Sequence, residues 1–415
     1  MNYHTKMLLG MAGAVVMFGG QAMAADCEVT HWWTSGGEAA AVAEFANALD
    51  ASGAGPWVDG AIGGSGDTAR PIIISRIMGG NPPCATQFNP GKDADDLIDA
   101  GLMLDLTELA EAEGWADIVY PPSQFQSCVR DGKVWCVPVN IHSGLWMWTN
   151  RNVFEEAGLE APNDWNELMA AAPALREKGI IPLSAAQGWP IGNLSTNIEV
   201  GVLGIDNFKK IYVDRDMDVA GSDTSRRVWE VLDEARQIID PAEIVPQWND
   251  AVSLVITGKA AANVMGDWAQ GEFQVAELVA GDDYDCLPGL GLNNVVDTGG
   301  DVFYFPKNDD PAVTETQLAL ASLMISKEVQ VAFNLKKGSM PIRLDVDLDA
   351  ANACMKKGLA ILGDPANAVP SGAQMLDRDT INQIRDLRNE FFTDTSITVD
   401  DAFAQFVDIL ANAPQ

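Results

Sequence analysis

Short apolar segments alternate with helical segments between residues 27 and 88. Residues 27–33, 57–62 and 85–88 are short and rich in strand-forming side chains, whereas residues 38–49 and 68–78 carry apolar side chains at helical spacing. This alternation predicts a parallel sheet with helices on both faces. Ligands of such sheets bind outside the carboxyl ends of the strands, so the residues that follow the three strands are the first candidates for a site.

Two adjacent tryptophans, Trp32 and Trp33, end the first of these strands. Side chains alternate between the faces of a strand, so one ring can be buried while the other faces a cleft. A flat aromatic face beside hydrogen-bonding groups suits a sugar ring, although a core that buries both rings fits the pair alone equally well. The second strand ends in the turn 63–67 and the third in Gln87 and Asn89, and this convergence favours a binding site.

The N-terminus has the pattern of a secretory signal peptide over residues 1–24. Its apolar run, residues 7–18, is too short to span a bilayer, and small residues predict cleavage after Ala24. Cys27 lies close to this point, which raises the alternative of a lipid anchor. Asp26 stands where such an anchor signal requires a small residue, so we expect a soluble exported protein that is located in the periplasm.

The chain is strongly acidic, with a net charge of −33 over 415 residues. This charge argues against binding to nucleic acid or to an anionic membrane surface, and indicates solubility rather than a particular fold. The length is sufficient for two domains with substantial cores.

All six cysteines lie after the leader, and an even number in an exported chain predicts disulfides. Cys128 and Cys136 flank the tight-turn pair Asp131-Gly132 and are expected to face each other across a hairpin. The sequence alone does not fix the connectivity. A metal site is the alternative, but the chain has no C-x-x-C and few histidines, so we expect no metal and no cofactor. The expected pairs are Cys27–Cys84, Cys128–Cys136 and Cys286–Cys354.

Elements of a second unit follow. Residues 134–139 predict a strand after which this unit begins. Asp164 and Glu167 have the spacing of a capping box at the start of a helix. Residues 225–239 carry an apolar stripe at helical spacing, and residues 377–410 predict a helical tail.

Several motifs, in order along the chain, resemble bacterial extracellular solute-binding proteins of carbohydrate ABC importers. The closest resemblance is to the periplasmic glucose/mannose-binding branch of that family, and it covers essentially the whole mature chain. The motifs are residues 32–38, 80–83, 162–168, 258–262 with 264–268, and 333–343.

The resemblance implies an α/β fold of two lobes like that of maltose-binding protein. Each lobe would hold a mixed, mainly parallel sheet flanked by helices, and hinge crossovers near 139–140, 299–300 and 341–343 would join them. Residues 25–139 with 300–341 would form the N-terminal lobe, and residues 140–299 with 342–415 the C-terminal lobe. The ligand would bind between the lobes, and the closed monomer would dock on an ABC permease with its ATPase subunits.

The resemblance also transfers a binding site, residue by residue. Two of these positions depart from the pattern: Asn89 replaces a frequent Lys, and Gln374 replaces a His of the glucose branch, which leaves the identity of the sugar open. Trp268 also fits a core residue, Asp301 a turn residue and Lys337 a solvated helix-end lysine. His142, near the first crossover, is expected at the hinge or the cleft rim. The expected ligand-binding residues are Trp32, Trp33, Glu38, Gln87, Asn89, His142, Trp268, Asp301, Lys337 and Gln374.

The expected function is therefore capture of a monosaccharide of the glucose or mannose type for import, without catalysis. Another small sugar or a short glucoside is the nearest alternative ligand. An exported glycoside hydrolase is the enzymatic alternative, but carboxylate pairs are common in so acidic a chain and argue little for hydrolysis. An amino-acid or peptide binder would require a charged anchor for the ligand.

Overall fold

The first sheet is built from the alternating segments near the N-terminus. The computed structural model describes residues 25–414, so the expected signal peptide and its cleavage site after Ala24 lie outside the described residues. Strands β1, β2 and β3 pair in parallel, as predicted, whereas β12 pairs antiparallel with β3 and β6. The order across the sheet is β2 (Trp57–Ala61), β1 (Cys27–His31), β3 (Ala85–Phe88), β12 (Val302–Tyr304) and β6 (Cys136–Pro138).

Helix α1 (Gly36–Ser52) connects β1 to β2, and helix α2 (Ser65–Met78) connects β2 to β3. The Ser35 side chain caps α1 by accepting a hydrogen bond from the backbone N–H of Glu38 at 3.4 Å. Gly64 precedes α2 with a φ of +95°, a conformation that favours glycine. Both helices therefore begin directly beyond the carboxyl ends of the strands.

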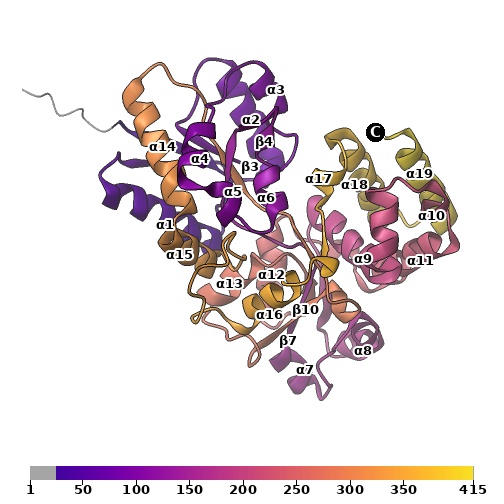
Figure 1. Ribbon diagram of the computed structural model, residues 1–415. Coiled ribbons are helices and arrows are strands. Elements are labelled where there is room, and N and C mark those ends of the chain that lie inside the picture. The colour runs from indigo at the N-terminus through magenta and orange to yellow at the C-terminus, as the bar shows by residue number, and fades with distance from the viewer. Residues whose placement is uncertain (1–24, 415) are drawn as a thin grey trace, which may run out of the picture.

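The second sheet, in the lower part of Figure 1, is also mixed. Its order is β10 (Tyr284–Pro288), β7 (Trp146–Asn150), β9 (Ala260–Val264) and β8 (Ile181–Ser184). Strand β8 runs parallel to β9, whereas β7 runs antiparallel to both of its neighbours. The Asp164 side chain caps α8 (Trp165–Glu177), but the Glu167 carboxylate accepts from the N–H of Asn163 at 2.8 Å rather than from that of Asp164.

Four helices form a layer at the right of Figure 1: α9 (Trp189–Tyr212), α11 (Asp223–Ile238), α18 (Arg378–Thr393) and α19 (Val399–Asn412). The predicted helical tail is thus two helices, because Thr398 caps a new helix after the break at Asp394. No single helix in residues 25–414 is long and apolar enough to cross a membrane, although α14 (Pro311–Ile325) and α15 (Lys327–Lys337), bent by 68°, reach that length and composition as a pair.

Further α-helices and strands complete the described chain. In the first half of the chain they are α3 (Asp95–Asp99), α4 (Thr107–Glu113), α5 (Trp115–Ile118), α6 (Pro122–Gln126), β4 (Val129–Arg130), β5 (Lys133–Val134) and α7 (Arg151–Ala157). In the second half they are α10 (Met217–Ala220), α12 (Trp248–Ile256), α13 (Ala269–Val275), β11 (Val296–Asp297), α14 (Pro311–Ile325), α15 (Lys327–Lys337), α16 (Ala353–Leu362), β13 (Ala368–Val369) and α17 (Gly372–Met375).

The chain passes between the two sheets three times. It leaves the first sheet after β6, returns to it between β10 and β12, and leaves it again between α15, which packs on α1, and α16, which contacts β10. Isolated bridges join Ile141 to Met340 and His142 to Gly299, so the three crossover segments lie side by side as a hinge. The expected crossovers fall in these intervals, and the exact lobe boundaries remain a prediction.

Two hydrophobic clusters hold the molecule together. One runs from the first sheet to one face of the second sheet, where Trp146 and Trp148 are buried. The opposite face, with Leu145 and Met147, packs against the helical layer. The second sheet is therefore covered on both faces.

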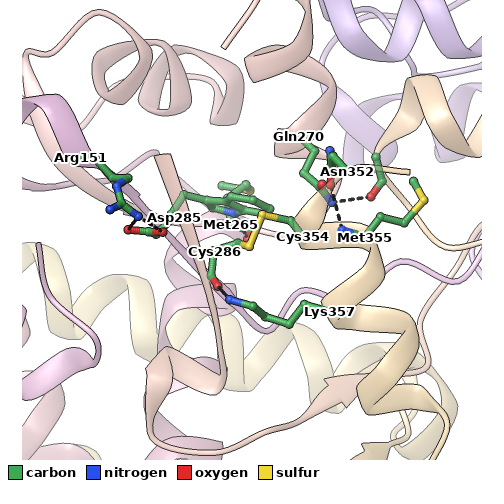
Figure 2. Close-up of a disulfide and its surroundings, with 11 residues drawn as sticks. Arg151, Met265, Gln270, Asp285, Cys286, Asn352, Cys354, Met355 and Lys357 are labelled. Carbon is green, nitrogen blue, oxygen red and sulfur yellow. Dashed lines mark hydrogen bonds and ion pairs between the residues drawn. A yellow bond between two sulfur atoms is a disulfide. The ribbon is translucent and has the colours of Figure 1, made fainter. Parts of the chain in front are cut away.

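Three disulfides join the same cysteine pairs that the sequence analysis expects: Cys27–Cys84, Cys128–Cys136 and Cys286–Cys354. The third, shown in Figure 2, ties β10 to the start of α16. Lys357 donates a hydrogen bond to the Cys286 carbonyl oxygen at 2.7 Å, and Arg151 pairs with Asp285 on the same strand (Figure 2).

Candidate ligand-binding cleft

A cleft of about 640 Å³ lies between the two lobes. One wall contains the residues that follow β1 and β3 and the start of α2, as the alternating pattern predicts. The other contains the starts of α9 and α12, the residue before α13, and one face of α18. Eight of the predicted residues border the cleft: Trp32, Trp33, Glu38, Asn89, His142, Trp268, Asp301 and Lys337.

The two tryptophans separate as strand alternation requires, and Trp33 is the buried one. Only 2% of its surface is exposed, and its ring centroid lies 5.7 Å from that of Phe303 and 5.3 Å from that of Phe333. Trp32 is half-buried and borders the cleft. Trp33 is therefore a core residue with almost no free surface, and Trp32 presents its ring; that these rings contact the ligand stays a prediction.

Gln87 positions the first wall and does not border the cleft. Its side chain is fully buried, accepts a hydrogen bond from the backbone N–H of Trp32 at 3.0 Å and donates one to Asp301 Oδ1 at 2.7 Å. Asn140 Nδ2 donates to Asp301 Oδ2 at 3.1 Å. The structure thus corrects Gln87 from a ligand contact to a support of Trp32 and Asp301, whose carboxylate keeps acceptor sites for a ligand hydroxyl.

An ion pair between Glu38 and Lys337 joins the start of α1 to the end of α15. The Lys337 Nζ lies 2.6 Å from Glu38 Oε1, and both side chains are more than nine-tenths buried. The same ammonium lies 5.2 Å from the centroid of the Trp33 ring. Because buried charges require partners, these two groups neutralise each other at the edge of the cleft.

Arg70, which the sequence analysis does not single out, organises the outer part of the first wall. Its Nη2 donates to Asn89 Oδ1 at 2.9 Å, and Asn89 Nδ2 donates to the Gly300 carbonyl oxygen at 3.2 Å. Its guanidinium carbon lies 5.4 Å from the centroid of the Trp32 ring, within the range of a cation–π contact. Trp32 and Asn89 are thus held by one side chain.

Trp268 lies at the centre of an aromatic cluster on the second wall. Its ring centroid is 5.0 Å from that of His142, 5.9 Å from that of Trp189 and 6.5 Å from that of Trp248. A Cβ on Gly266 would meet the Trp268 ring at 2.0 Å, so the absence of a side chain there permits the position of the ring. The second wall is therefore mainly aromatic.

His142 connects the two walls at the hinge. Its Nε2 lies 3.7 Å from Asp301 Oδ2, and its backbone N–H donates to the Gly299 carbonyl oxygen at 3.1 Å. Its buried Nδ1 has no hydrogen-bond partner among the described residues.

Two buried carboxylates hold the hinge backbone that follows His142. Asp267 Oδ2 accepts from the N–H of Ser143 at 2.9 Å, and Asp297 Oδ2 accepts from that of Gly144 at 2.6 Å. Burial raises the pKa of both carboxyls, that of Asp267 well above its usual value, although these hydrogen bonds oppose the shift.

Comparison with known proteins places this geometry in a family. The family model for bacterial extracellular solute-binding proteins matches residues 62–358. The chain belongs to this family.

Relatives and solved structures agree with that membership. A probable sugar-binding periplasmic protein of Brucella melitensis is 36% identical over 337 residues, which cover 81% of this chain and 79% of the relative. A chitin oligosaccharide binding protein superposes with a TM-score of 0.75 at 18% identity, covering 94% of this chain and 98% of that one. The bacterial solute receptor AcbH, which has an exclusive preference for β-D-galactopyranose, superposes with a TM-score of 0.74 at 18% identity, covering 93% of this chain and 97% of that one. These likenesses show the two-lobed fold.

In this solute-binding protein Gln374 lies outside the main cleft, contrary to expectation. It forms a capping box at the start of α17, where its Oε1 accepts from the backbone N–H of Ser371 at 3.0 Å. It borders a separate pocket beside Tyr120 and Lys209. The local hydrogen bonds of the cap hold its side chain there, so the position gives no contact in the cleft.

The second wall also carries charged residues that are not among the expected site residues. Glu199 and Tyr212 of α9 bond to each other at 2.8 Å, and Arg388 of α18 donates to Glu199 at 2.7 Å; all three border the cleft. Arg378 and Arg385 lie on the same face of α18. The sequence feature that could have indicated these arginines is their spacing along one face of an amphipathic helix in an otherwise acidic chain.

Proposed function

We propose that this protein captures a neutral sugar in the interlobe cleft and delivers it, as a periplasmic monomer, to the permease and ATPase subunits of an ABC importer. The preferred ligand is a monosaccharide of the glucose or mannose type. The observation that carries the proposal is the placement of Trp32 on one wall opposite the Trp268 cluster on the other, with Asn89 and Asp301 beside them. Aromatic faces bind the C–H faces of a sugar, and a few polar groups bind its hydroxyls.

The charges around the cleft support a neutral ligand. Five lysine or arginine side chains border it, and each contacts a carboxylate. A binder of amino acids or peptides requires a cation left free for the ligand carboxylate. The pairing leaves no such cation among the described residues of the walls.

The size of the sugar is the finer part of the proposal. The volume of about 640 Å³ lies in the middle of the range of roughly 300–1,000 Å³ for small-molecule sites. The proteins with similar folds range from a galactopyranose receptor to a chitin oligosaccharide binding protein. Another small sugar or a short glucoside is therefore the second candidate ligand.

A glycoside hydrolase is the alternative from another class. Hydrolysis requires one carboxyl as acid and a second as base or nucleophile across the scissile bond. The Glu38 carboxylate is paired with Lys337, and the Asp301 carboxylate accepts hydrogen bonds from the side-chain amides of Gln87 and Asn140. These interactions favour binding over catalysis.

The decisive experiment is isothermal titration calorimetry of the mature protein with glucose, mannose, galactose, xylose and simple disaccharides. We expect saturable binding of at least one monosaccharide, which should also raise the midpoint of thermal unfolding. Chromatography of the sugars after incubation should show no product. Binding of disaccharides alone would replace the monosaccharide proposal, and conversion of any sugar would replace the binding proposal.

A matched set of variants locates the site. Trp32→Ala and Trp268→Ala should each weaken sugar binding, whereas Trp57→Ala, a half-buried ring on β2 away from the cleft, should not. Equal affinities in all three variants would place the site elsewhere.

A further inference from the structure

Ion pairs join the two lobes across the opening of the cleft. Arg385 of α18 donates to Asp67 of α2 at 2.8 Å, and Arg378 of α18 donates to Asp93, which precedes α3, at 2.5 Å and 3.1 Å. The partners in each pair are more than 280 residues apart in the chain. In Figure 1, α2 and α3 lie in one lobe and α18 in the other.

We propose that this network, which we call the clasp, holds the cleft closed and thereby raises the affinity for the ligand through its effect on closure. The clasp consists of Asp67, Arg70, Asp93, Arg378 and Arg385. The proposal goes beyond the proposed function, because closure of the lobes can be measured without any sugar.

The central carboxylate of the clasp is shared between the lobes. The Asp93 side chain is 8% exposed. It lies between Arg378 of the second lobe and Arg70 of the first lobe, and its Oδ2 is 2.8 Å from the Arg70 Nε. A partly desolvated carboxylate with two guanidiniums gains more from pairing than an exposed ion pair does. Moving α18 away would leave Asp93 with Arg70 alone.

The clasp also touches the ligand-binding wall. Arg70 contacts the Trp32 ring at 5.4 Å and holds Asn89 by a hydrogen bond. A sugar that orders Trp32 therefore also orders Arg70 and the carboxylate that Arg378 binds. Ligand binding and clasp formation should favour each other.

A second interlobe contact, between α1 and α13, lies away from the clasp. Helices α1 and α13 approach so closely that a Cβ on Gly37 would lie 2.5 Å from the carbonyl carbon of Gly271. In Figure 1 these helices lie on the left of the molecule, and α18 lies on the right. A rotation about the hinge that keeps this close contact in place would separate the clasp partners.

The test measures the interlobe distance in the full mature protein without ligand. All six cysteines are in disulfides, so Met78→Cys on α2 and Gln383→Cys on α18, both exposed, can carry spin labels for pulsed electron paramagnetic resonance. We expect a narrow distance distribution for the parent and a shift to longer distances in Arg378→Ala/Arg385→Ala and in 1 M NaCl. Arg226→Ala, which removes an exposed pair with Asp400 inside the second lobe, should leave the distribution unchanged.

Two further variants serve as controls in case Arg378→Ala/Arg385→Ala misfolds. Asp67→Asn changes one exposed atom and should cause a smaller shift in the same direction, and Asp67→Arg/Arg385→Asp should restore the parental distances. Unchanged distances in Arg378→Ala/Arg385→Ala, or no restoration by the exchange, would overturn the clasp.

Affinity provides the second readout. For a sugar that binds the parent in calorimetry, Arg378→Ala/Arg385→Ala should raise the dissociation constant by roughly tenfold through faster dissociation. If none of glucose, mannose, galactose, xylose and the simple disaccharides binds the parent, the proposed function fails while the distance measurement still decides on the clasp. If a sugar binds both proteins equally, the clasp fails and the proposed function stands.

Discussion

The two walls of the cleft are built by different means. The first wall comes from strand ends and is fixed by a closed set of hydrogen bonds, in which Gln87 joins Trp32 to Asp301. The second wall consists of rings and guanidiniums on helix starts and on α18, held together mainly by packing. The polar wall is thus prearranged within one lobe, whereas the position of the aromatic wall depends on how the lobes close. Four predictions test this comparison.

The largest expected effect is on the stability of the first wall. Trp33→Ala should lower the free energy of unfolding by roughly 3–5 kcal/mol, because it removes a large buried ring that packs on Phe303 and Phe333. Urea denaturation followed by circular dichroism measures this loss. The neighbouring Trp32→Ala should cost less than about 1 kcal/mol and should instead weaken sugar binding. Equal losses of stability in both variants would contradict the assignment of Trp33 to the core and of Trp32 to the binding site.

The buried ion pair tests whether the first wall depends on charge balance. Lys337→Met should lower the free energy of unfolding by about 3 kcal/mol, because it leaves the Glu38 carboxylate buried without its partner. The double variant Glu38→Gln/Lys337→Met should recover most of this loss in the same denaturation assay. A double variant less stable than Lys337→Met would show that the pair stabilises by more than mutual neutralisation.

The second wall is tested through affinity rather than stability. Trp268→Ala should weaken binding of the sugar identified by calorimetry by about 2 kcal/mol, or roughly 30-fold, because a central aromatic contact is lost. Gly266→Ala should act in the same direction, because the added methyl group meets the Trp268 ring at 2.0 Å and displaces it. An unaltered affinity in Gly266→Ala would show that the ring position is not critical.

The smallest expected effect concerns pH and the hinge carboxylate Asp267. Its pKa in the folded protein lies well above 3.8, so the folded state binds the proton more tightly than the unfolded state. The stability from this proton is fully present below pH 3.8 and is lost as the pH rises through the raised pKa, by at most about 1.4 kcal/mol per pH unit. Asp267→Asn, which keeps an acceptor for the Ser143 N–H, should therefore gain stability relative to the parent as the pH rises. Parallel stability curves for the two proteins between pH 4 and pH 8 would contradict this assignment.

The sequence predicts more of the first wall than of the second. Local patterns place the strands and turns of residues 27–89, so they also place Trp32 and Asn89 at one edge of the sheet. Local patterns do not say which of two neighbouring rings is covered, because that depends on Phe303 and Phe333 from distant segments.

The second wall depends still more on long-range packing. Trp248 and the arginines of α18 reach the cleft only through the arrangement of helices around the second sheet, which no local pattern specifies. The expected position of Gln374 is wrong for the opposite reason. Its local capping hydrogen bond with Ser371 holds the side chain away from the position that the family resemblance suggests.

The disulfide between Cys286 and Cys354 gives the molecule a second covalent path around its third crossover (Figure 2). That crossover contains Leu344, which is 66% exposed and offers a protease an accessible bond. A cut there would divide the polypeptide but not the protein, because the C-terminal fragment would stay attached to β10 through sulfur. The nicked molecule should run as one species on a non-reducing gel and as two after reduction, and the oxidised protein should tolerate proteolysis at its own hinge.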